Sequence, residues 1–144
     1  MTPMTHFERL GGEQVLRVII RDFYSRVFDD LMIGFMFKGR DRERLIELET
    51  QFTARALGAQ SVYEGRGMRQ AHAGVPILIG QFQRRYQILK ETLEAHEVDP
   101  DVTQAWLGHT RALQRAVMAP DRRDLTCRAP LPPAAVVPPL GEPQ

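Results

Sequence analysis

The sequence predicts an all-α fold. Four segments carry apolar residues at helical spacing, over residues 13–30, 41–57, 77–95 and 99–118, and no stretch shows the apolar–polar alternation of a half-buried strand. A further segment, over residues 62–74, is interrupted by glycines and has room for only one or two helical turns. These observations indicate two pairs of long helices that are joined by a long link.

Composition limits the classes of protein to consider. A chain of 144 residues with 43% hydrophobic residues is long enough for one domain with a real core. Its 19 Lys and Arg against 18 Asp and Glu leave a formal charge of +1, which argues against nucleic-acid and anionic-membrane partners. The single cysteine, Cys127, excludes an intrachain disulfide and fits a reducing compartment. Because neither a secretory signal nor a membrane-spanning run is evident, we expect a cytoplasmic protein.

The first predicted helix follows a sharp turn at Leu10-Gly11-Gly12. Tyr24 lies on it beside an apolar stripe that comprises Ile20, Val27 and Phe28. The short segment 31–39 is rich in large apolar residues between glycines, and we expect a tight corner that turns either Phe35 or Phe37 inward.

The second predicted helix begins at the N-cap Asp41 and ends at Gly58. Its spacing predicts an inward face of Leu45, Leu48, Phe52 and Ala56. Glu49 falls within that face, where a carboxylate is unusual.

The third and fourth predicted helices complete the domain. The third carries one apolar stripe, formed by Phe82, Tyr86, Leu89 and Leu93. The fourth opens at Asp99-Pro100, and its expected buried face consists of Val102, Ala105, Trp106, His109, Leu113, Ala116 and Val117. Seven of the ten prolines lie between Pro120 and Pro143. We therefore expect a domain over residues 1–118 and a disordered proline-rich tail over residues 119–144.

The link between the helix pairs holds a single histidine, His72, at the end of its short helical part. A link of this length inside a small domain is usually kept for function. A histidine placed opposite a large apolar helix face can bind the iron of a flat macrocycle. The alternative is a core histidine with one hydrogen bond.

Five motifs in order resemble those of the truncated haemoglobins, most closely group I. They are Leu10-Gly11-Gly12, Asp22-Phe23-Tyr24-Ser25-Arg26-Val27, Phe35-Met36-Phe37, Ala56-Leu57-Gly58-Ala59 and Tyr63-Glu64-Gly65-Arg66-Gly67-Met68-Arg69-Gln70-Ala71-His72. The resemblance covers roughly residues 7–118. It implies a globin-like two-over-two helical sandwich around haem b, with a short proximal helix.

The resemblance also implies roles for individual residues. His72 matches the proximal ligand of the haem iron, Phe37 the corner phenylalanine that packs on the porphyrin, and Tyr24 the distal tyrosine. A phenol there donates a hydrogen bond to iron-bound dioxygen. The alternative for Tyr24 is a tyrosine buried between helices. Apolar walls are expected from a further set, which core packing would also explain: Phe23, Leu45, Leu48, Phe52, Met68, Val75 and Leu89.

Two residues depart from the family pattern. Glu49 stands where the group often has glutamine, and Arg85 stands where a distal residue is usually apolar or aromatic. One hypothesis is a Glu49–Arg85 ion pair linked to Tyr24, since a buried carboxylate needs a partner. In the other, Glu49 turns to solvent and Arg85 reaches a haem propionate.

The sequence thus predicts a haem-binding globin that reversibly binds dioxygen, nitric oxide and carbon monoxide. Oxygen transport or storage, nitric oxide detoxification and peroxidase-like chemistry all fit such a pocket, and enzymatic turnover would need an external reductase. The rival prediction is a haem-free helical sensor or interaction module whose proline-rich tail docks a partner. His109 is expected to be a core or interface histidine, with a second haem ligand as the alternative.

Overall fold

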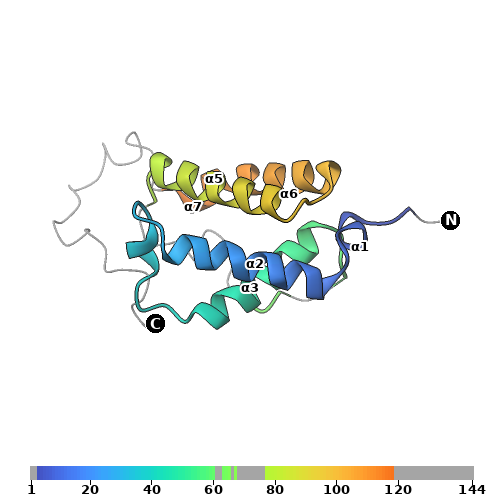
Figure 1. The fold of residues 1–144 in the computed structure, drawn as a ribbon, viewed down its shortest axis with the longest axis horizontal. Coiled ribbons are helices and arrows are strands. Elements are labelled where there is room, and N and C mark those ends of the chain that lie inside the picture. Colours follow the sequence, from blue (N-terminus) through green and yellow to red (C-terminus); the bar gives the residue numbers. More distant parts are fainter. Residues whose placement is uncertain (1–2, 61–62, 66, 68–76, 119–144) are drawn as a thin grey trace.

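The chain forms two layers of helices. The computed structural model describes residues 3–60, 63–65, 67 and 77–118. In one layer α2 (Glu13–Phe28) packs against α3 (Arg42–Ala56), and in the other α5 (Ile79–Ala95) packs against α6 (Pro100–Ala112) (Figure 1). The described residues contain helices and turns but no strand, so the all-α prediction is confirmed. None of the described helices is long and apolar enough to cross a membrane.

A short first helix, α1 (His6–Leu10), was not expected from periodicity. Thr5 and Glu8 form a capping box: the Thr5 hydroxyl accepts the Glu8 N–H at 3.0 Å, and the Glu8 carboxylate accepts the Thr5 N–H at 2.9 Å. The helix ends at Gly11 and Gly12, whose φ values of 120° and 87° are unfavourable for other residues. Five residues are too few for a periodic pattern, but the Thr-x-x-Glu spacing was a readable signal.

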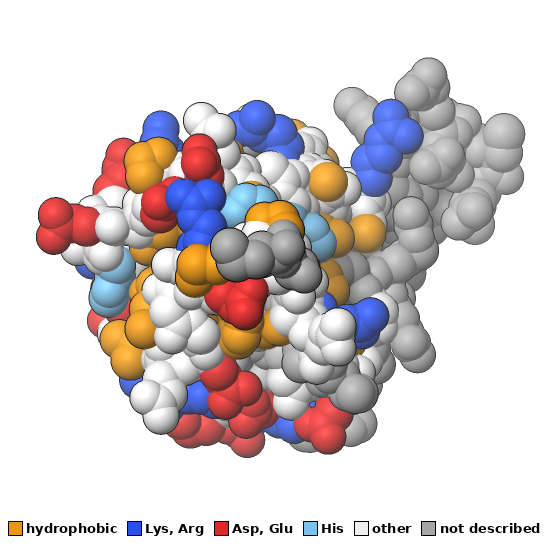
Figure 2. Space-filling view, turned by 90° about the vertical axis from the view of Figure 1, so that its right-hand side faces the viewer, with side chains coloured by type: hydrophobic (Ala, Val, Ile, Leu, Met, Phe, Trp, Pro, Cys, Tyr) orange, Lys and Arg blue, Asp and Glu red, His pale blue; other side chains and the backbone are white. Residues whose placement is uncertain are grey.

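The α1 end of the molecule carries charged side chains of both signs. Figure 2 shows acidic and basic groups interspersed over the described part of this face. Among them, Arg9 of α1 contacts Asp99 at 2.9 Å and Asp101 at 3.4 Å, at the start of α6. These exposed ion pairs connect the two layers and contribute modestly to stability.

Helix α2 is the central element because it packs against both α3 and α5. Its buried residues recur at i, i+3, i+4, i+7, i+8 and i+11 and so form one broad face: Leu16, Ile19, Ile20, Phe23, Tyr24 and Val27. The Tyr24 side chain is consequently fixed between the layers, with only 5% of the residue exposed.

The corner after α2 contains the 3-10 helix η1 (Gly34–Phe37). Asp30 holds this corner, since one carboxylate oxygen accepts the N–H groups of Met32 and Ile33 at 2.9 and 3.1 Å. Its other oxygen accepts two hydrogen bonds from Arg84 of α5, at 2.9 and 2.7 Å. Of the two phenylalanines considered for the inward position, Phe37 is half-buried and Phe35 is 58% exposed.

Helix α3 begins as expected, with the Asp41 carboxylate accepting the Arg44 N–H at 3.1 Å. The expected inward face was partly wrong. Ala56 is exposed, and the side of α3 that packs into the core carries Ile46, Thr50, Thr53 and Ala54. The other residues of the expected face, Leu45, Leu48 and Phe52, are half-buried and border a pocket. The reason is that α3 packs against α2 with one side and faces the opposite layer with another.

The last two expected helices differ from the structure in their bounds. Helix α5 begins at Ile79 rather than at Ile77, after Leu78 in extended conformation. The segment expected as one helix over 99–118 is divided into α6 and α7 (Gln114–Val117). The Leu113 N–H bonds the carbonyl of Thr110, three residues back, at 3.1 Å, so the helix tightens and ends there. The expected tail, residues 119–144, lies outside the described residues.

A pair of glycine substitutions tests the corner. A Cβ added at Gly34 would lie 2.6 Å from the carbonyl oxygen of Phe28, and backbone cannot yield as a flexible side chain does. We expect Gly34→Ala to lower the free energy of unfolding by about 1–3 kcal/mol. The matched control is Gly108→Ala in the exposed face of α6, where a Cβ would meet nothing within 4 Å. This change should raise stability by about 0.5–1 kcal/mol, as measured by urea unfolding.

Candidate functional site

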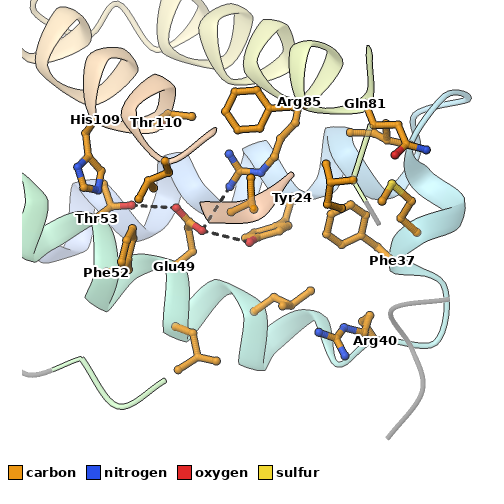
Figure 3. A pocket seen from close by; sticks show the side chains of 18 of the residues that line it. Tyr24, Phe37, Arg40, Glu49, Phe52, Thr53, Gln81, Arg85, His109 and Thr110 are labelled. Carbon is orange, nitrogen blue, oxygen red and sulfur yellow. Dashed lines mark hydrogen bonds and ion pairs between the residues drawn. The ribbon is translucent and has the colours of Figure 1, made fainter. Parts of the chain in front are cut away.

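A pocket of about 200 Å³ lies between the two helical layers. Helices α2, α3, α5, α6 and α7 contribute to its walls, together with the corner around η1. Figure 3 shows His109 at one end, Arg40 and Gln81 at the other, and Glu49 between them. The lining residues are Tyr24, Ile33, Met36, Phe37, Arg40, Leu45, Leu48, Glu49, Phe52, Thr53, Tyr63, Ile77, Gln81, Phe82, Arg85, His109, Thr110, Leu113 and Val117.

Aromatic rings build the wall beside the corner. The Phe37 ring packs edge-on against Tyr24, with ring centres 6.2 Å apart, and lies tilted against Phe28, with ring centres 5.6 Å apart. Because Tyr24 comes from a buried helix and Phe37 from the corner that Asp30 holds, both rings have defined positions. Such walls suit a flat apolar group.

Glu49 is the centre of a polar network in this pocket (Figure 3). One carboxylate oxygen of Glu49 lies 3.4 Å from the Tyr24 hydroxyl and 3.4 Å from Nη2 of Arg85. Its other oxygen accepts a hydrogen bond from the Thr53 hydroxyl at 3.0 Å. The Glu49 and Arg85 side chains are 18% and 26% exposed. Of the two arrangements left open by the sequence, the structure contains the ion pair linked to Tyr24.

The environment keeps the Tyr24 phenol protonated. Burial is the largest cause that raises the pKa of Tyr24 above its usual value of 10, and the negative charge of Glu49 raises it further. Arg85 opposes both effects only in part. Tyr24 therefore remains a neutral hydrogen-bond donor that borders the pocket.

His109 projects into the far end of the same pocket. Its ring lies against Phe52, with ring centres 5.3 Å apart. Its Nε2 atom is buried and has no hydrogen-bond partner among the described residues. Sequence reasoning placed His109 on a buried face, with a second haem ligand as the alternative, and the structure places this residue in the pocket lining. Buried polar atoms are normally hydrogen-bonded, so an unpaired nitrogen in the described part of the structure is unusual.

Comparisons with known proteins agree with this architecture. The family described as bacterial-like globin matches residues 5–119. A group 1 truncated hemoglobin, GlbN of Mycolicibacterium paratuberculosis, is 32% identical over 106 residues, which span 74% of this chain and 78% of the relative. The chain belongs to the bacterial-like globins. Within them it belongs to the group 1 truncated haemoglobins.

Solved structures support the same assignment. The globin superimposes on the Fe(III) form of truncated hemoglobin from Tetrahymena pyriformis with a TM-score of 0.76 and 25% identity, over 81% of this chain and all of that chain. A group II truncated hemoglobin from Bacillus anthracis, 21% identical with a TM-score of 0.75, shares the fold and covers 84% of this chain and 96% of that chain. The two-over-two globin fold is thus shown, and membership implies a haem cofactor.

The structure brings together seven of the residues expected at the site. Those that line the pocket of this globin are Tyr24, Phe37, Leu45, Leu48, Glu49, Phe52 and Arg85. Phe23 and Leu89 do not line it, contrary to expectation, and are buried at 1% and 2% exposure. The Arg85 guanidinium carbon lies 4.9 Å from the centre of the Phe23 ring and so separates it from the pocket. His72, Met68 and Val75 lie outside the described residues.

The residues present fit a haem group. Haem is a flat apolar ring with two carboxylates at one edge, and the described walls are mainly aromatic and aliphatic. Polar side chains gather in the Glu49 network and at the two ends, where Arg40 and His109 lie (Figure 3). The ring of His109 forms part of the wall at one of these ends.

The raised pKa of Tyr24 predicts a pH dependence. A group whose pKa is raised on folding stabilises the fold fully below its unfolded value, about 10 for tyrosine, and loses this contribution as the pH rises above it. We expect the folded globin and its Tyr24→Phe variant to show the same rise in phenolate absorbance up to about pH 11. A smaller rise in the variant would mean that Tyr24 ionises normally.

Proposed function

We propose that this globin binds haem b in the pocket through His72 and reversibly binds dioxygen, nitric oxide and carbon monoxide in the cytoplasm. The observation that carries the proposal is the protonated Tyr24 phenol, which borders a largely apolar pocket in a chain of the truncated haemoglobin group. Haem would supply an iron with an open coordination position for a diatomic gas.

Tyr24 would act as the hydrogen-bond donor to a ligand held in the pocket. Its hydroxyl lies 3.4 Å from Glu49, well beyond the mode of about 2.7–2.8 Å for O–H donors. Since this contact is weak, the phenol can turn its proton toward a ligand at little cost. The surrounding apolar side chains strengthen the new bond because they exclude water.

Arg85 and Thr53 would keep Glu49 in place while Tyr24 turns. Thr53 donates to one Glu49 oxygen at 3.0 Å, and Arg85 contacts the other at 3.4 Å. The carboxylate thereby remains compensated, so the proton of Tyr24 is not required to hold it. Phe37 and Leu45 would cover the ring of the cofactor from the distal side, in agreement with their half-buried positions in the pocket wall.

Haem binding itself is tested by the absorption spectrum of the purified globin supplied with haem. We expect a Soret band that titrates to one haem per chain. Replacing His72 by Ala should change the ligand-field bands of the iron, whereas His109→Ala should leave them unchanged, because only His72 is proposed as the axial ligand. The absence of a Soret band would favour the haem-free module. If the ligand-field bands change in the His109 variant and not in the His72 variant, His109 rather than His72 is the ligand of the iron.

The role of the phenol is tested by ligand dissociation. We expect Tyr24→Phe to release dioxygen roughly ten- to hundredfold faster in stopped-flow measurements, since a buried hydrogen bond is lost. Tyr86→Phe is the matched control: its hydroxyl contacts Arg111 at 2.6 Å and does not line the pocket. Glu49→Gln should change the rate by a smaller factor. An unchanged rate in that variant would remove Glu49 from the network that sets ligand release.

The physiological role requires a separate measurement. Reaction of the dioxygen-loaded globin with nitric oxide distinguishes a carrier from a dioxygenase, because only the latter returns nitrate with turnover when an external reductase is supplied. If nitric oxide is not converted to nitrate with turnover, the proposed role is the transport or storage of dioxygen.

A further inference from the structure

The guanidinium of Arg85 lines the pocket, and its one ion pair within the described part of the chain, to Glu49, is long. The group carries five N–H donors, yet its hydrogen bond to Glu49, donated by Nη2, is long at 3.4 Å. A second contact of the group is with the face of Phe23, 4.9 Å from the guanidinium carbon to the ring centre. Figure 3 shows the side chain reaching from α5 toward Glu49 and the space beside Tyr24.

The preceding residue, Arg84, shows what a fully engaged arginine looks like on the same helix. Its Nε and Nη2 atoms both donate to Asp30, at 2.9 and 2.7 Å, within the usual range for a charge-assisted bond. Asp30 in turn holds the corner. Arg84 therefore serves the fold, whereas Arg85 is only loosely paired.

The loose pairing follows from how Glu49 is held. Thr53, one turn along α3, donates to one carboxylate oxygen at 3.0 Å, which is the shortest of the three contacts to Glu49. Arg85 and Tyr24 share the other oxygen at 3.4 Å each. Because Thr53 anchors the carboxylate on its own helix, Arg85 can turn some of its five N–H donors to another anion while its positive charge stays beside Glu49.

We propose that Arg85, together with the Tyr24 hydroxyl, forms a subsite for small inorganic anions in the distal pocket, with Glu49 as an internal competitor. This proposal rests on the haem-binding function proposed above. A guanidinium stays protonated at all working pH values, and its attraction for an anion is stronger in a pocket that excludes water. The phenol adds a neutral donor on the same side. The expected ligands are monovalent anions of two to four atoms or single halides.

The probe is azide, titrated optically into the haem-loaded ferric globin at constant pH and ionic strength. Glu49→Gln should tighten azide binding because it removes the competing charge and preserves the size of the side chain. Adding Arg85→Gln to that variant should then weaken binding roughly ten- to hundredfold, the effect of losing a hydrogen bond to a charged group. Arg85→Lys, which keeps the charge, should retain part of the affinity and provides a second variant if the Arg85→Gln protein folds poorly.

Two controls separate the subsite from general electrostatics. Lys90→Gln removes one positive charge from an exposed position of α5, outside the pocket lining, and should leave azide affinity within about twofold, the scale expected for a solvent-screened charge. Carbon monoxide binding to the ferrous form should respond to Arg85→Gln much less than azide binding does, because the ligand is uncharged.

The outcomes are distinct. Equal losses in the Lys90 and Arg85 variants, or equal losses for azide and carbon monoxide, would overturn the subsite. Azide affinity that Arg85→Gln leaves unchanged in the Glu49→Gln background would also overturn it. A globin that takes up no haem would remove the proposed function and the subsite together, whereas a normal Soret band with no dependence on Arg85 would remove the subsite alone.

Discussion

Helix α2 packs at once against α3 in its own layer and against α5 in the other layer, and the rest of the structure depends on this constraint. A helix that packs against α3 and α5 at once must carry a broad apolar face, and the buried residues of α2, which recur at i, i+3, i+4, i+7, i+8 and i+11 from Leu16, form one. Tyr24 is the member of this set with a polar end. Burial of its ring fixes where the hydroxyl lies, so the position of the hydrogen-bond donor is a consequence of core packing rather than of a flexible loop.

The same constraint explains how the pocket tolerates a carboxylate. Glu49 faces the space between the layers and cannot easily reach bulk water, so it must be compensated from within. The three groups that contact it come from α2, α3 and α5. Since each contact originates on a different helix, the network forms only when both layers have docked. Its long contacts leave Tyr24 and Arg85 able to respond to a ligand, whereas the short Arg84–Asp30 contacts keep the corner fixed.

Several features could be predicted from local signals. Asp41 and Asp99 as N-caps, the glycine turn after Leu10 and the bounds of α2 and α3 all follow from residues close in sequence. The helix α1 was missed because its five residues are too short for periodicity. The break at Leu113 was missed because the pattern of apolar residues continues across it. Phe23 does not line the pocket, and the Arg85 guanidinium lies over its ring, an arrangement that the sequence does not reveal.

The sequence by itself determined the helical class, the family resemblance and the unusual pair Glu49 and Arg85, because these depend on residue types and spacing along one chain. Only the tertiary structure decided that these two residues pair, that Phe37 is half-buried while Phe35 is exposed, and that a nitrogen of His109 is buried without a partner among the described residues. The physical reason is that a side chain's partners are set by the distance between helices. Spacing along a helix specifies which face a residue shares, but not what lies opposite that face.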